Sequence, residues 1–178
     1  MYIDNLKVIL EKHQLWLEGK PGGVRADLSG ANLPRVNLSG VDLSKANFYG
    51  ADLSRADFSW ANLSWANLSK ADLSGANFST ARLSGANLSG ATLSGADLFG
   101  SNLYGADLSG TRTAVITNLG GYFVHIDHEY IIIGCQRHLA NDWKNFSDEQ
   151  IANMALNALS YWKKYKKIIL SLHKETNK

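Results

Sequence analysis

Three histidines and the single cysteine of the chain gather in the stretch HIDHEYIIIGCQRH, as His125, His128, Cys135 and His138. Imidazole nitrogens and thiolates are preferred zinc ligands, and a cysteine near a histidine can act as nucleophile and base. However, His125 and His128 are three residues apart, so on one strand they would face opposite sides. No third residue that would orient His138 is apparent. We therefore expect no metal and no cofactor, take Cys135 as a buried structural residue, and keep a Cys/His enzyme as an alternative.

A second group of candidate residues combines basic and aromatic side chains near the C-terminus. Lysines of this kind could contact phosphates, and interleaved aromatic rings occur in proteins that bind single strands. A solvated face of an amphipathic helix has the same appearance, and nucleic acid is therefore not the expected partner. The group consists of Lys163, Lys164, Lys166 and Lys167 with Tyr161, Trp162 and Tyr165.

The composition excludes several classes of protein. The chain has 178 residues and a formal net charge of +2, distributed as +1 over residues 1–25, −2 over 26–110 and +3 over 111–178. One cysteine cannot build an internal disulfide framework, and no apolar run approaches the ~20 residues that cross a bilayer. The first twenty residues lack the pattern of a signal peptide. These features predict a soluble, cytoplasmic protein without a membrane partner.

The elements that must position these residues are set by a repeat of five. Seventeen pentapeptides run from Ala26 to Gly110, each with a central Leu or Phe, a small residue two places before it, and usually Asp or Asn between. Five residues advance a helix by about 140°, so the central residues would form no stripe. On a straight strand they would alternate between faces. Short extended sides joined by Ser-Gly turns satisfy the pattern, and such sides stack into a solenoid.

The motif resembles the pentapeptide repeat family, whose repeat reads A(D/N)LXX. The resemblance implies a mainly β fold, a right-handed quadrilateral parallel β-helix with four pentapeptides per coil and about four coils here. Positions twenty apart then stack. On that basis Phe58 and Phe78 are core neighbours, Arg35 stacks on Arg55, and Phe99 and Tyr104 take places where most repeats carry Ser.

Residues that depart from the repeat are the candidate binding residues, because the fold already explains the consensus. Trp60 and Trp65 are expected at adjacent outward corners of one coil, with Lys45 beside the second, while Arg82 replaces Asp or Asn. Exposed aromatic residues beside Lys or Arg are enriched at binding surfaces, although packing against a terminal segment or a second copy would also explain the tryptophans. The other candidate binding residues are Arg55 in the repeat, and Arg137, His138 and Trp143 in the segment that follows the repeat.

The repeat has different segments at its two ends. Residues 1–25 predict a helix from Asp4 to Leu17, stopped by GKPGG, that caps the solenoid. His13 on this helix is expected as a packed or surface residue and not as a ligand. Residues 111–178 predict a small α+β extension: a β-meander, then a capping box at SDEQ that starts a helix running from Ile151 to about Leu172. Through IIIGCQRHLANDW the flanks resemble those of phage- and prophage-encoded members of the family.

The function expected from these observations is that of a rigid, non-enzymatic binding protein with a protein partner, and the phage-like flanks imply action on a bacterial host system. Capture of a nucleotide or another small ligand stays an alternative. Some family members resemble duplex DNA and bind DNA gyrase, but that mechanism needs a strongly acidic rod, and here five basic residues offset seven Asp. The outward tryptophans and apolar terminal helices also predict a homodimer.

Overall fold

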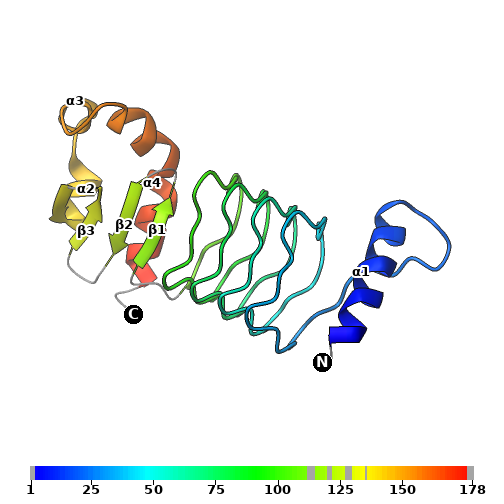
Figure 1. The fold of residues 1–178 in the computed structure, drawn as a ribbon. Helices are drawn as coiled ribbons and strands as arrows, with labels where there is room; N and C mark the ends of the chain where they lie inside the picture. Colours follow the sequence, from blue (N-terminus) through cyan, green and yellow to red (C-terminus); the bar gives the residue numbers. More distant parts are fainter. Residues whose placement is uncertain (1–2, 112–114, 120–121, 127–129, 135, 176–178) are drawn as a thin grey trace.

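The repeat forms a four-sided solenoid with one further structural unit at each end (Figure 1). The structure is a computed structural model that describes residues 3–111, 115–119, 122–126, 130–134 and 136–175. We number the coils from the start of the repeat: the first comprises residues 26–45, the second 46–65, the third 66–85 and the fourth 86–105. Helix α1 lies at one end of the solenoid, and a sheet with three helices lies at the other.

A turn at every fifth residue creates the corners of the coil. The backbone N–H of each small residue bonds the carbonyl of the preceding central residue, as Ala51 does with Phe48 at 3.1 Å. The residue just before the small one has a positive φ at every corner, for example 62° at Gly50. A turn with a positive φ at its third position is of the type that favours glycine there. The Ser-Gly pair of the repeat is therefore the corner itself.

The Asp or Asn of each repeat supports its own corner. In fourteen of the seventeen repeats its side-chain oxygen accepts a hydrogen bond from the backbone N–H two residues later, as Asp52 does from Ser54 at 3.0 Å. This local bond is the reason for Asp and Asn in turns. Within the fully described span 26–110, three repeats lack this bond. In one, the donor position is Pro34, which has no N–H; in the other two, Arg82 or Thr92 takes the place of the Asp or Asn acceptor.

Parallel bridges between residues twenty apart stack the coils. They run without interruption from Asp27↔Asn47 to Asn87↔Asp107. Asn67 bridges both Asn47 and Asn87, and Asp72 bridges both Asp52 and Thr92, as a coil of twenty residues requires. Five residues per side and twenty per coil give four sides, so the predicted β-helix period is confirmed.

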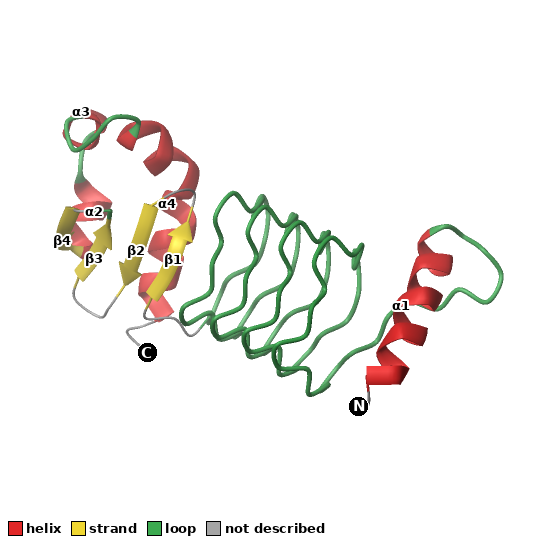
Figure 2. Ribbon diagram, viewed as in Figure 1, coloured by secondary structure: helices red, strands yellow, loops and turns green. Residues whose placement is uncertain are grey.

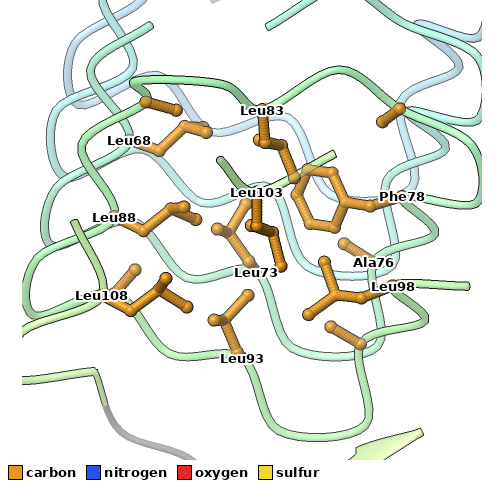
Figure 3. Packing of buried hydrophobic residues seen from close by; sticks show 14 of the residues in the cluster. Leu68, Leu73, Ala76, Phe78, Leu83, Leu88, Leu93, Leu98, Leu103 and Leu108 are labelled. Atoms are coloured by element: carbon orange, nitrogen blue, oxygen red, sulfur yellow. The ribbon is translucent and has the colours of Figure 1, made fainter. Parts of the chain in front are cut away.

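The interior of the solenoid consists of alternating small and large columns. From Leu38 to Leu98 every central Leu or Phe is buried, and so is each Ala of the sides between them. Figure 3 shows Leu68, Phe78 and Leu83 pointing toward one another from different sides of the coil. Phe58 and Phe78 stack with ring centroids 5.1 Å apart, which confirms their predicted contact.

The N-terminal helix is attached to the first coil through a buried histidine. Helix α1 spans Ile3–Leu17, and His13 accepts a hydrogen bond at Nδ1 from the backbone N–H of Ala26, 3.1 Å away. The His13 ring also stacks on Trp16. The predicted helix and the packed role of His13 are therefore confirmed.

The C-terminal unit is an antiparallel sheet covered by helices (Figure 2). Its strands lie in the order β1-β2-β3-β4, with β1 at Val115–Leu119, β2 at Tyr122–Ile126, β3 at Tyr130–Ile133 and β4 at Gln136–Leu139. The helices are α2 (Ala140–Asn145), α3 (Asp148–Ala152) and α4 (Ala158–Glu175). None of the described helices is both long and apolar enough to span a bilayer.

The sequence interpretation of this unit is correct in part. The meander and the Ser147–Gln150 capping box are confirmed. The prediction of one helix from Ile151 to about Leu172 is wrong, because the chain leaves the helix after Ala152 and resumes it at Ala158. Asn157 takes a positive φ of 66° at this break. Strand β4 and helix α2 lie in the segment read as IIIGCQRHLANDW and were not predicted as elements.

Because a buried histidine joins α1 to the coil, we expect the free energy of unfolding to depend on pH. Burial lowers the pKa of His13, outweighing the Asp42 carboxylate and the Ser44 backbone, which raise it; Arg25 lowers it further. As the pH falls through the ordinary histidine value of about 6.5, the unfolded chain takes up the proton before the folded chain does. The free energy of unfolding should therefore decrease from about pH 7.5 to 5.5.

Melting temperatures measured across this range should fall more steeply for the unmodified protein than for His13→Gln, which carries no titratable group at this position. The other histidines are present in both proteins, so the difference in slope isolates His13. Equal slopes would show that folding does not lower the pKa of His13.

Candidate binding face

One side of the solenoid collects the exposed aromatic side chains. We call this side with its two corners the tryptophan face; it comprises residues 39–45, 59–65, 79–85 and 99–105. Trp60 is 73% exposed and Trp65 is 69% exposed, and they lie at the two corners of the second coil. Phe99 and Tyr104 lie at the same two corners in the fourth coil, 49% and 85% exposed. Tyr49, the other exposed aromatic residue of the described repeat, lies at a different corner.

The centre of the tryptophan face is a column of four polar side chains, Asp42, Asn62, Arg82 and Asn102. The bridges Asp42↔Asn62, Asn62↔Arg82 and Arg82↔Asn102 fix their order along the solenoid. Asp42 accepts hydrogen bonds from the Ser44 backbone at 2.9 Å and from the Asn62 amide at 3.1 Å. Burial raises the pKa of Asp42, but these donors outweigh it and hold the pKa below its ordinary value. The column is thus anionic in the first coil and cationic in the third.

The Trp65 ring lies along its corner, toward the third coil. A Cβ atom placed on Gly85 would meet the ring at 2.7 Å, closer than real contacts allow. Gly85, with a φ of 66°, is therefore required both by the corner and by the ring above it. On its other side Trp65 lines a shallow groove with Arg25, Lys45 and Asn67. The predicted position of Lys45 beside Trp65 is confirmed.

Side chains at these corners reduce the stability of the solenoid. A left-handed conformation costs a non-glycine residue roughly 1–2 kcal/mol. The repeat accepts this cost at seven corners, all between residues 35 and 80, whereas every corner from Gly85 to Gly110 carries glycine. Strain of this kind is concentrated at functional sites in proteins. The seven residues are Arg35, Lys45, Arg55, Trp60, Trp65, Lys70 and Thr80.

Arg55 does not lie on the tryptophan face. It stacks with Arg35, as predicted, and the two line a shallow groove with Pro34, Ser54 and Ser74. This corner is diagonally opposite the corner of Lys45 and Trp65. The sequence candidates in the repeat therefore divide into Trp60, Trp65, Arg82 and Lys45 on one face and Arg55 on another.

Of the three candidates in the C-terminal unit, Trp143 belongs to its interior and His138 lies at its edge. Trp143 is buried and donates from Nε1 to the Ile131 carbonyl at 2.7 Å, and its ring contacts Trp162. The half-buried His138 ring packs edge-on against Trp143 and Phe146. Trp143 is thus inaccessible to a partner, and its prediction as a binding residue is wrong. The Arg137 side chain lies outside what the structure describes.

Most of the Cys/His cluster lies outside what the structure describes. His128 and Cys135 lie outside the described residues, as does the side chain of His125. Among the residues that are described, no three His, Cys, Asp or Glu side chains gather as metal ligands. A cavity between α3, α4 and β3 has a volume of about 40 Å³, which is room for about one water molecule and too little for a nucleotide.

Three lysines of α4 have local partners. Lys163 forms an ion pair with Asp148 at 2.8 Å. Lys164 and Lys166 lie over the rings of Tyr165 and Trp162, at 5.1 and 5.5 Å from the centroids. These contacts fit a solvated helix face.

Two exposed residues of the tryptophan face were not among the sequence candidates. Phe99 and Tyr104 stand out as substitutions of the consensus Ser, but this alone does not connect them with the tryptophans. The connection is visible once positions are compared modulo twenty, because residues 59–60 and 99–100 then share one corner and residues 64–65 and 104–105 share the next.

Comparison with known proteins gives matches to the repeat. Residues 24–59, 61–98 and 76–112 match the sequence family described as pentapeptide repeats, in eight copies. HetL, a pentapeptide repeat protein involved in heterocyst differentiation regulation in the cyanobacterium Nostoc sp. PCC 7120, is 37% identical, with a TM-score of 0.53. This match covers 56% of this chain and 47% of HetL.

Two further solved structures are similar over about half of the chain. A pentapeptide repeat protein of the Arabidopsis thaliana thylakoid lumen is 41% identical, with 48% of this chain and 60% of that protein covered and a TM-score of 0.48. A trypsin-treated form of QnrB1, a plasmid-mediated fluoroquinolone resistance protein, is 26% identical, with 50% and 45% covered and a TM-score of 0.26. No curated protein was found to be similar. The chain thus spans less than two thirds of each of these structures.

The contact between Trp65 and Gly85 gives a testable prediction. Gly85→Ala should lower the free energy of unfolding by the left-handed strain of about 1–2 kcal/mol plus the cost of displacing the Trp65 ring. Gly105→Ala is the matched control, because it has the same corner conformation with only ordinary contacts, the nearest at 3.9 Å.

Chemical denaturation should therefore show a larger loss for Gly85→Ala than for Gly105→Ala. In a protein that already carries Trp65→Ala, the two losses should become equal. Equal losses in the unmodified protein would mean that the ring does not lie on Gly85.

Proposed function

Since the chain belongs to the pentapeptide repeat family, we propose that it is a rigid, non-enzymatic binding protein that engages a protein partner through the tryptophan face. The observation that carries this proposal is the position of Trp60 and Trp65. Both are about 70% exposed at corners where glycine would be the more stable residue. Truncation of Trp or Arg at the centre of a protein interface commonly costs roughly 2 kcal/mol or more.

The solenoid is suited to present such side chains without rearrangement. Its sides are bridged to their neighbours at every step from Asp27 to Asp107, and its corners are closed by backbone and side-chain hydrogen bonds. A surface held in place before binding loses little conformational entropy when a partner arrives. We take the coil to be right-handed, as in the fold that the family implies.

A small anionic ligand is the second candidate, favoured by the groove at Arg35 and Arg55. Arg35 and Arg55 at stacked corners, with Ser54 and Ser74 lining the same groove, suit a phosphate group. The same groove has no aromatic residue among its lining side chains that would hold a base, so a nucleotide is less favoured here than a protein partner. A thermal-shift measurement with a nucleotide panel tests directly whether the protein binds a nucleotide.

Mimicry of duplex DNA is disfavoured by the electrostatics of the repeat. Its seven Asp are offset by five basic residues, and each Asp carboxylate accepts a hydrogen bond from its own corner, as in Asp107 with Ser109. We therefore do not propose gyrase as the target. The likeness of the flanks to phage-borne proteins supports a partner in a bacterial host system and a cytoplasmic location, and both stay proposals.

The proposal predicts that binding and stability separate in variants of the tryptophan face. Trp60→Ala, Trp65→Ala and Arg82→Ala should each weaken partner capture by about thirtyfold, with little change in melting temperature because these side chains are exposed. Ser94→Ala, at an exposed consensus position, should change neither property.

The measurement is a pull-down from bacterial lysate with quantitative mass spectrometry, followed by titration of the identified partner. A partner bound equally well by all variants would move the function to the C-terminal unit. Unfolding of the tryptophan variants would make these residues part of the fold instead.

A further inference from the structure

We propose that the tryptophan face binds a second copy of this chain, with the two solenoids antiparallel and related by a two-fold axis through Asn62. The inference rests on the proposed function, since it names the occupant of the same face. In such a pair the axis runs across the second coil, from Trp60 past Asn62 to Trp65. Each surface then meets itself, as symmetric dimers require.

The charges of the central column are self-complementary only in this arrangement. Asp42 lies one coil before Asn62, and Arg82 lies one coil after it. Reversal of the solenoid about Asn62 therefore places Asp42 opposite the partner's Arg82 and Arg82 opposite the partner's Asp42. A parallel pairing of the same faces would place Asp42 on Asp42 and Arg82 on Arg82. Like charges in contact across an interface are strongly unfavourable, so the antiparallel order is selected.

The direction in which Trp65 leans adds a second complementary contact. Its ring covers Gly85, one coil toward the C-terminus. In the antiparallel arrangement the Trp65 ring of the partner leans toward the first coil of this copy, where Lys45 is the corner residue. A lysine or arginine cation near a tryptophan ring is favourable, more so once water is excluded. Each Trp65 ring thus lies over Gly85 of its own chain and opposite Lys45 of the other copy.

The size of the face is consistent with a reversible dimer. Four tryptophans, two from each copy, would together bury on the order of 600 Å², about half of what a small stable interface buries. The remainder is available from neighbouring parts of the face. Tyr104, 85% exposed, would lie opposite the segment that enters the partner's first coil, where Val24 is 57% exposed.

A charge-swap experiment tests this arrangement. Arg82→Asp restores the consensus residue and a side-chain acceptor for Ser84, so the monomer should fold at least as well. In the dimer, Arg82→Asp would place an aspartate opposite the partner's Asp42. Asp42→Arg uses a residue that the same column already accepts at Arg82, and it would place Arg opposite Arg82. Each single variant should weaken dimerisation by about tenfold or more, and the double variant Asp42→Arg with Arg82→Asp should recover it.

Sedimentation equilibrium gives the dissociation constant of each variant. The unmodified protein should have a mass of twice the 19.5 kDa of one chain. Asp72→Arg is the matched control: it changes the same position of a repeat, but on a different side of the solenoid, and should leave the dimer intact. A single-chain mass for the unmodified protein, or a dimer unaffected by either single variant, would overturn the inference.

A cross-linking experiment tests the axis itself. In a Cys135→Ser background, Asn62→Cys should be linked between chains by a short bismaleimide, because residue 62 faces its own copy. Asn102→Cys, on the same face but two coils away, should not be linked. Equal cross-linking at both positions would contradict the antiparallel register.

Failure of the dimer and failure of the proposed function are distinguishable. If the protein is a monomer, and Trp60→Ala still loses a different protein partner, this inference is wrong and the tryptophan face is still a binding surface. If Trp60→Ala changes neither mass nor partner capture, both are wrong.

Discussion

Every fifth residue of the solenoid must take a left-handed backbone conformation, and the rest of the structure follows from that requirement. The corner turns the chain into the next side, resets the alternation of side chains, and allows Ala and Leu to point inward on all four sides. The parallel bridges then form at a spacing of twenty. Asp and Asn close the corners from within fourteen of the seventeen repeats, so all seven Asp of the repeat serve the fold before they can serve a ligand.

Since the consensus residues build the core and close the corners, the residues that depart from the consensus are free to carry function. A consensus repeat leaves only the corners and the outward polar position open to change. The chain uses these positions for Trp60, Trp65 and Arg82 on one face, although glycine is the more stable residue at the corners and Asp or Asn completes the corner hydrogen bond. Residues that reduce stability without filling the core need another explanation, and a binding surface that is complementary to itself supplies one.

Much of this arrangement can be predicted from the sequence, because its period is regular. The coil length, the Phe58–Phe78 contact and the placement of Trp65 beside Lys45 all follow once positions twenty apart are stacked. The lean of the Trp65 ring over Gly85 cannot be read from the repeat, since it depends on the rotamer and on space at the next corner. The C-terminal unit has no repeat. There, the break at Asn157 and the burial of Trp143 depend on tertiary packing that periodicity does not record.

The central claim is that Trp60 is retained at a cost to the fold, and the most direct measurement of it is the free energy of unfolding of Trp60→Gly. The measurement belongs in the Arg82→Asp background, where association should not contribute. The account predicts a more stable protein, by about 1 kcal/mol, because glycine adopts the corner conformation, with φ at 62°, without strain. A less stable protein would contradict it, since Trp60 would then be a residue that the solenoid needs for its own packing.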